Sequence, residues 1–211
     1  MRPAARITVA AFAITLVGCA DSPVELPPGD ASALHAEHAR GRGSLTSETL
    51  VELAQVRRAT ARYHNIALAF DAGYRVWSPD PFSATATCAS SPEGKMGYHL
   101  VNPDLRGSPL DPANADATLD PTRPEMLLYE KRADGKLHLV GVEYLVFKAA
   151  WEREHGENAP NPQLLGQTVP FSSHAFPPLT ADPVDHYELH VWIWKPNPNG
   201  MFSHWNPRIS C

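Results

Sequence analysis

Several signatures of familiar enzyme chemistry are missing from this sequence of 211 residues. It has no Gly-x-Ser-x-Gly nucleophile elbow, no His-Glu-x-x-His helix, no phosphate-binding glycine loop and no haem-attaching Cys-x-x-Cys-His motif. It also lacks a cluster of lysines and arginines that would neutralise phosphates, and its net charge is −5. These absences argue against the enzyme classes that use those motifs and against a nucleic-acid partner.

Long apolar runs are also scarce. The run at residues 7–17 follows a short basic segment and is too short to span a bilayer, as is typical of a signal peptide. It ends in Leu-Val-Gly-Cys, which resembles the lipobox of bacterial lipoproteins. We therefore expect a signal peptide at 1–18, lipidation of Cys19, and a flexible tether at 19–45. An ordinary secretory signal is the alternative, and it too would export the protein.

Cysteine is rare, with three in the chain and no Cys-x-x-Cys pair. If a lipid modifies Cys19, Cys88 and Cys211 remain as the two thiols of an oxidising compartment, and we expect them to form a disulfide. The alternative for this pair is a metal-ligating or redox role.

Residues 46–211 are enough for a single domain, and most of the 21 prolines lie between apolar runs. Apolar residues spaced by three and four predict one long helix over 46–72. Strands are expected at residues 96–101, 125–130, 136–147 and 186–194, and Asp134-Gly135 predicts a hairpin between the second and third. Alternation along 136–147 places Leu139 on the same face as Glu143, and Val140 on the other face. The fold class is therefore α+β, with the long N-terminal helix packed on a curved, mainly antiparallel, cone-like sheet and with long Pro-rich loops at 104–124 and 148–185. A small cupin-like β-barrel is the alternative.

The strand at 186–194 carries unusual side chains on one face. Alternation places Tyr187, Leu189, Val191 and Ile193 on a core face, and Glu188, His190, Trp192 and Trp194 on the other. Paired tryptophans beside an acid and an imidazole are typical of a pocket wall rather than a solvated face. We expect a pocket lined by Tyr98, Glu188, Trp192 and Trp194.

Three polar residues stand where central strand positions are usually apolar: His99, Glu143 and His190. Two imidazoles and a carboxylate on a rigid sheet form a ligand set for Zn, Fe, Mn or Cu with an open coordination position. His204 is the candidate fourth metal ligand, Glu188 could serve as a ligand or support one, and His174 is a weaker candidate. Glu143 and His190 are also the candidate catalytic pair, with or without a metal. The competing interpretation is a core histidine hydrogen-bonded to a buried glutamate.

The segments at residues 59–74, 96–103, 124–130, 139–144 and 192–211 resemble an uncharacterised group of exported bacterial proteins. The similarity covers most of the chain beyond the tether. It implies one exported domain and assigns no role to any residue.

These observations predict a lipid-anchored, extracytoplasmic metal-binding protein, or a metalloenzyme that acts on a small molecule. The anchor would lie in the outer membrane of a Gram-negative host and otherwise at the cell surface. The alternatives are a module that binds an apolar or sugar ligand without metal, and a structural envelope protein. The sequence does not determine the metal, the reaction or the oligomeric state.

Overall fold

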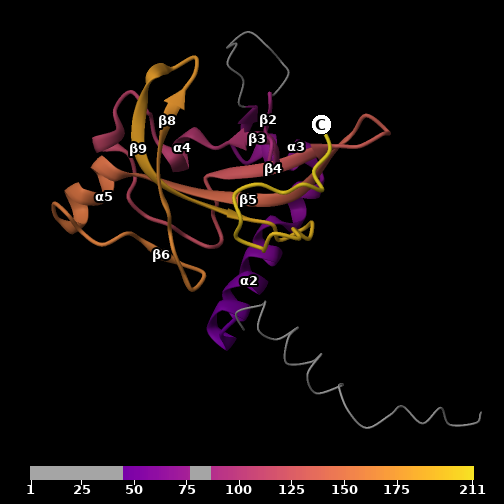
Figure 1. The fold of residues 1–211 in the computed structure, drawn as a ribbon, viewed down its shortest axis with the longest axis horizontal. Coiled ribbons are helices and arrows are strands. Elements are labelled where there is room, and N and C mark those ends of the chain that lie inside the picture. Colours follow the sequence, from indigo (N-terminus) through magenta and orange to yellow (C-terminus); the bar gives the residue numbers. More distant parts are fainter. Residues whose placement is uncertain (1–44, 77–86) are drawn as a thin grey trace, which may run out of the picture. The chain divides into compact units, whose positions relative to one another are not determined.

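The computed structural model describes residues 45–76 and 87–211, all within one compact unit, Arg42–Cys211 (Figure 1). The predicted signal peptide, Cys19 and nearly all of the tether lie outside the described residues. No helix in the described ranges is long and apolar enough to cross a membrane.

The stretch predicted as one helix is divided into three pieces. They are α2 (Ser47–Thr60), the 3₁₀ helix η1 (Ala61–His64) and α3 (Ile66–Asp71). Thr46 caps α2 by accepting a hydrogen bond from the Thr49 backbone N–H. The break before α3 comes at Asn65, whose extended backbone ends η1 and whose side chain caps α3 by accepting a hydrogen bond from the Ala67 N–H. A capping asparagine inside an apolar pattern is the local signal for this break.

Seven strands form one antiparallel sheet in the order β1-β3-β4-β5-β9-β8, with β2 also paired to β3 (Figure 1). The bounds are Arg75–Val76 for β1, Cys88–Ser91 for β2, Gly94–Val101 for β3, Met126–Lys131 for β4, Leu137–Phe147 for β5, Phe171–Phe176 for β8 and Thr180–Val191 for β9. The class is therefore α+β with a mainly antiparallel sheet, as predicted. The sheet is open, which corrects the alternative of a closed cupin-like barrel.

The predicted hairpin is confirmed in β4 and β5, with Gly135 at a φ of 77° in the turn. Its register shifts between Leu128 and Tyr129, so that Leu128 pairs with Gly141 and Tyr129 with Leu139. This bulge interrupts the simple alternation predicted along the strand. On the N-terminal side of the bulge in β5, Leu139 belongs to the main buried cluster, whereas Val140 belongs to a small second cluster.

One face of the sheet packs against the helical segment that α2, η1 and α3 form. Leu53 and Val56 of α2 belong to the same buried cluster as Tyr144, Leu189 and other strand residues. The hydroxyl of Tyr129 crosses to the helical side and donates to the Tyr63 carbonyl at 2.7 Å. With this face filled by the core, the polar residues of β5 and β9 project from the opposite face.

The segment at 148–185, predicted as a long loop, contains regular structure. It holds α5 (Lys148–His155), the small hairpin of β6 (Gln163–Leu164) and β7 (Gln167–Thr168), all of β8 and the start of β9. The other predicted loop, at 104–124, is mostly irregular but includes most of α4 (Pro103–Arg106) and all of η2 (Pro112–Asn114). The prediction underestimated the first segment because β8 carries polar side chains and is largely exposed.

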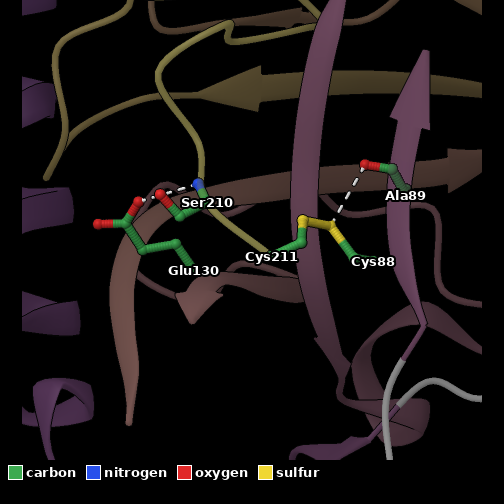
Figure 2. Close-up of a disulfide and its surroundings, with 5 residues drawn as sticks. All are labelled: Cys88, Ala89, Glu130, Ser210 and Cys211. Carbon is green, nitrogen blue, oxygen red and sulfur yellow. Dashed lines mark hydrogen bonds between the residues drawn. A yellow bond between two sulfur atoms is a disulfide. The ribbon is translucent and has the colours of Figure 1, made fainter. Parts of the chain in front are cut away.

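Cys88 and Cys211 form the predicted disulfide, with their Cα atoms 6.0 Å apart (Figure 2). It attaches the C-terminal tail to β2. Backbone hydrogen bonds between Lys95 and Asn206 support the same tail, and the Ser210 N–H donates to Glu130 Oε2 at 3.3 Å (Figure 2). The tail residues held in this way include His204 and Trp205, both of which line the cavity described below.

Gly97 is a position where the fold requires glycine. Its φ is +88°, and an added Cβ would lie 2.3 Å from the Tyr129 carbonyl oxygen on the neighbouring strand. We expect Gly97→Ala to lower the free energy of unfolding by about 3 kcal/mol, measured by urea denaturation. Gly135→Ala is the control, because its φ of +77° is similar but nothing lies within 4 Å. The control should lose only about 1 kcal/mol, and equal losses would contradict this explanation.

Glu125 is a buried carboxyl group whose Oε2 accepts a hydrogen bond from the Leu145 N–H at 3.1 Å. Burial raises its pKa well above the ordinary value, although that hydrogen bond opposes the shift. The folded protein therefore binds a proton that the unfolded chain releases, so stability falls as pH rises from the unfolded toward the folded pKa. Glu125→Gln should raise the melting temperature at pH 8 and change it little at pH 4. An equal change in melting temperature at pH 4 and pH 8 would contradict the raised pKa of Glu125.

Candidate metal centre

His99, Glu143 and His190 come from three strands and lie together on the face opposite the helical segment. The register of β5 and β9 places Glu143 directly opposite His190. His99 lies on β3, which β4 separates from β5, and its side chain reaches across β4 to the same carboxylate. The ligand atoms of the three side chains all lie within 4.8 Å of one another. The structure therefore brings together the three residues that the sequence singled out.

The distances within this set fit ligands of a shared ion. Glu143 Oε2 is 3.1 Å from His99 Nε2 and 3.4 Å from His190 Nε2. Two ligands bonded at about 2.1 Å to one metal, at angles between 90° and 109°, lie about 3.0 to 3.4 Å apart. In the described part of the chain, Glu143 Oε2 and both ring nitrogens of His190 make no hydrogen bond of normal geometry. A structural imidazole-carboxylate pair would be expected to align such a bond.

The electrostatics leave both residues in a form that can bind a cation. Burial raises the pKa of Glu143, but the nearby His190 and His99 outweigh it and leave that pKa below its usual value. Burial lowers the pKa of His190, even though Glu143 and Glu188 oppose the shift. An ionised carboxylate and a neutral imidazole are the protonation states that metal ligation requires.

The set opens onto a cavity of about 410 Å³. His99 and Glu143 reach its surface, while the His190 side chain is 1% exposed and lies behind them. The walls are largely apolar, formed by Met96, Met126, Leu145, Phe176 and Trp205 among others. An ion held by the three side chains would therefore lie at the floor of the cavity, with a coordination position facing the space above.

The other predicted ligands are close by but lie outside this set. The ring of His204 packs edge-on against that of His190, with ring centroids 4.5 Å apart, and His204 Nδ1 is 3.7 Å from Glu188 Oε1. His174 and Glu188 also line the cavity. Together with His186 they form a second group of potential ligands, in which all ligand atoms lie within 4.8 Å of one another.

Of the four residues predicted to line the pocket, only Glu188 does so. Tyr98 packs against the main core on the other face of β3. Trp192 is buried with Leu128, Val140 and Ile209, and Trp194 turns to the helical side, where its Nε1 donates to Thr60 Oγ1 at 3.2 Å. The prediction failed for Trp194 because β9 ends at Val191, so the alternation does not continue that far. Trp192 lies next to His190 as the alternation predicts, but it is buried against Ile209 of the C-terminal tail and not exposed to the cavity.

Two residues of the site were missed. His186 shares a strand face with Glu188 and His190, so the same alternation could have identified it. Arg106, at the end of α4, had no comparable signal. It is buried in the cavity wall, its Nε donates to the Gly107 carbonyl, and burial lowers its pKa to about 10. The guanidinium is still charged at neutral pH, so this wall carries a positive charge opposite the carboxylates of the cavity.

Comparisons of the chain with protein-family models, with curated proteins and with solved structures found no match. Functional conclusions about this site therefore depend on its own geometry.

Proposed function

We propose that this protein binds one transition-metal ion through His99, Glu143 and His190 and presents it to a small molecule in the cavity. The main support is the buried carboxylate, which lies 3.1 and 3.4 Å from two imidazole nitrogens without normal hydrogen-bond geometry to satisfy it. Zn, Fe, Mn and Cu all accept such ligands.

The chemistry of this site would follow from an open coordination position beside a largely apolar wall. A metal ion there would polarise a bound oxygen or lower the pKa of a bound water. In this proposal Glu143 and His190 are metal ligands, so they do not serve as the general acid and base that a metal-free mechanism would need.

We further propose that the protein is exported and anchored in the bacterial envelope through a lipid on Cys19, as expected for the group of exported proteins that it resembles. A disulfide between Cys88 and Cys211 suits an oxidising compartment. We also propose that the open sheet curves into a cone-like shape.

The test is metal content by mass spectrometry of the full chain, purified without a His tag and reconstituted with each of the four metals. The wild type should retain metal, and His190→Ala should lose about one equivalent. His155→Ala is the matched control, because His155 is exposed on α5 and absent from the cavity lining. If His190→Ala retains as much metal as the wild type, the proposed site is wrong.

The apolar walls favour one second candidate, a module that binds a small apolar or sugar-like ligand without metal. It predicts no metal retention in any variant and a ligand affinity that changes on substitution of Trp205. Loss of stability alone in His190→Ala, without metal or ligand binding by the wild type, would instead indicate a structural envelope protein.

A further inference from the structure

A second group of metal-ligand side chains lies beside the first and shares none of its residues. It consists of His174 on β8 with His186 and Glu188 on β9. Glu188 Oε2 is 3.6 Å from His174 Nε2 and 3.4 Å from His186 Nε2. The side chains of His186 and Glu188 are 0% and 5% exposed, so water does not readily solvate this carboxylate.

Backbone carbonyls orient both imidazoles of this group. His186 Nδ1 is 2.7 Å from the Val184 oxygen, and His174 Nδ1 is 3.0 Å from the Ala175 oxygen. A carbonyl oxygen can only accept, so each Nδ1 must carry the hydrogen. In the neutral rings the lone pair is then on Nε2, which is the atom that faces Glu188. Donation of the other ring N–H to a carbonyl is the usual support for a metal-ligating histidine.

Two neutral rings would direct lone pairs at a buried carboxylate. Without a metal, at least one ring must therefore carry a second proton and donate from Nε2 to Glu188, over 3.4 Å from His186 or 3.6 Å from His174. One metal ion would satisfy the two nitrogens and the carboxylate together.

We propose that His174, His186 and Glu188 bind a second transition-metal ion. This inference goes beyond the proposed function and does not require it. The two sets share no ligand, so two ions would occupy separate sites beside the same cavity. His204 contacts both sets, through the ring of His190 and through Glu188 Oε1.

The test measures zinc stoichiometry in the full chain after loading with Zn²⁺ and removal of loosely bound metal. His174→Ala is the informative variant, because the side chain is 49% exposed and its loss leaves the core intact. Glu143→Gln reports on the first set, and His155→Ala is again the control. We expect two equivalents of zinc in the wild type and in the control. His174→Ala and Glu143→Gln should each retain one equivalent, and the variant that carries both substitutions should retain none.

The possible failures are distinguishable. If His174→Ala retains the wild-type stoichiometry, the second site does not exist. If either single variant loses all the zinc, the two sets hold one shared ion, which also overturns this proposal. If Glu143→Gln leaves the stoichiometry unchanged while His174→Ala loses one equivalent, the second site stands and the first is wrong.

Discussion

Replacing Cys88 and Cys211 together with serine is expected to lower the free energy of unfolding by about 4 kcal/mol. The disulfide joins residues 123 apart in the sequence, so it closes a long loop that restricts the unfolded chain. Without it the C-terminal tail is held by its hydrogen bonds, among them those to β3 and β4, and by its side-chain contacts. Urea denaturation of the double variant and the wild type measures the loss.

The wild type treated with a phosphine reductant is the control, and it should reproduce the loss seen in the variant. Equal unfolding midpoints for the oxidised wild type and the double variant would show that the bond adds no stability. Because His204 and Trp205 belong to the same tail, the variant should also bind metal or ligand in the cavity less tightly.

The second large effect is expected from the metal. A ligand that binds only the folded state at 1,000 times its dissociation constant stabilises that state by about 4 kcal/mol. Zinc should therefore raise the melting temperature of the wild type by several degrees, and a chelator should reverse the change. Glu143→Gln should lose the part of this gain that comes from the ion at His99, Glu143 and His190, because a neutral amide is a much weaker ligand than the buried carboxylate.

Glu157→Gln is the matched control, since Glu157 is exposed and absent from the cavity lining. It should respond to zinc as the wild type does. If Glu143→Gln gains as much stability from zinc as the wild type, Glu143 is not a ligand. If the variant is destabilised equally with and without zinc, its role is structural pairing.

Local patterns in the sequence predicted much of the sheet. Asp134-Gly135 gave the hairpin of β4 and β5, because few other dipeptides accept the backbone of such a turn. Alternation assigned the faces of β9 correctly as far as Val191. The alternation failed in β5 before Gly141, because the bulge depends on how β4 and β5 pair and the sequence of neither strand indicates it.

The candidate site was predictable in its members but not in its assembly. His99, Glu143 and His190 each stood out as polar residues on apolar strands. Their convergence depends on the order of β3, β4, β5 and β9 and on the register that pairs Glu143 with His190. These are long-range features, which periodicity within one strand does not encode. Arg106 was missed for the same reason, since only the tertiary fold brings α4 to the cavity.

The most direct test of the metal centre is a crystal structure of the full chain grown with zinc, with anomalous diffraction measured at the zinc absorption edge. We predict an anomalous peak about 2.0 to 2.2 Å from His99 Nε2, His190 Nε2 and a carboxylate oxygen of Glu143. Crystals in which zinc binds only elsewhere on the protein, with these three side chains hydrogen-bonded to one another, would contradict the account.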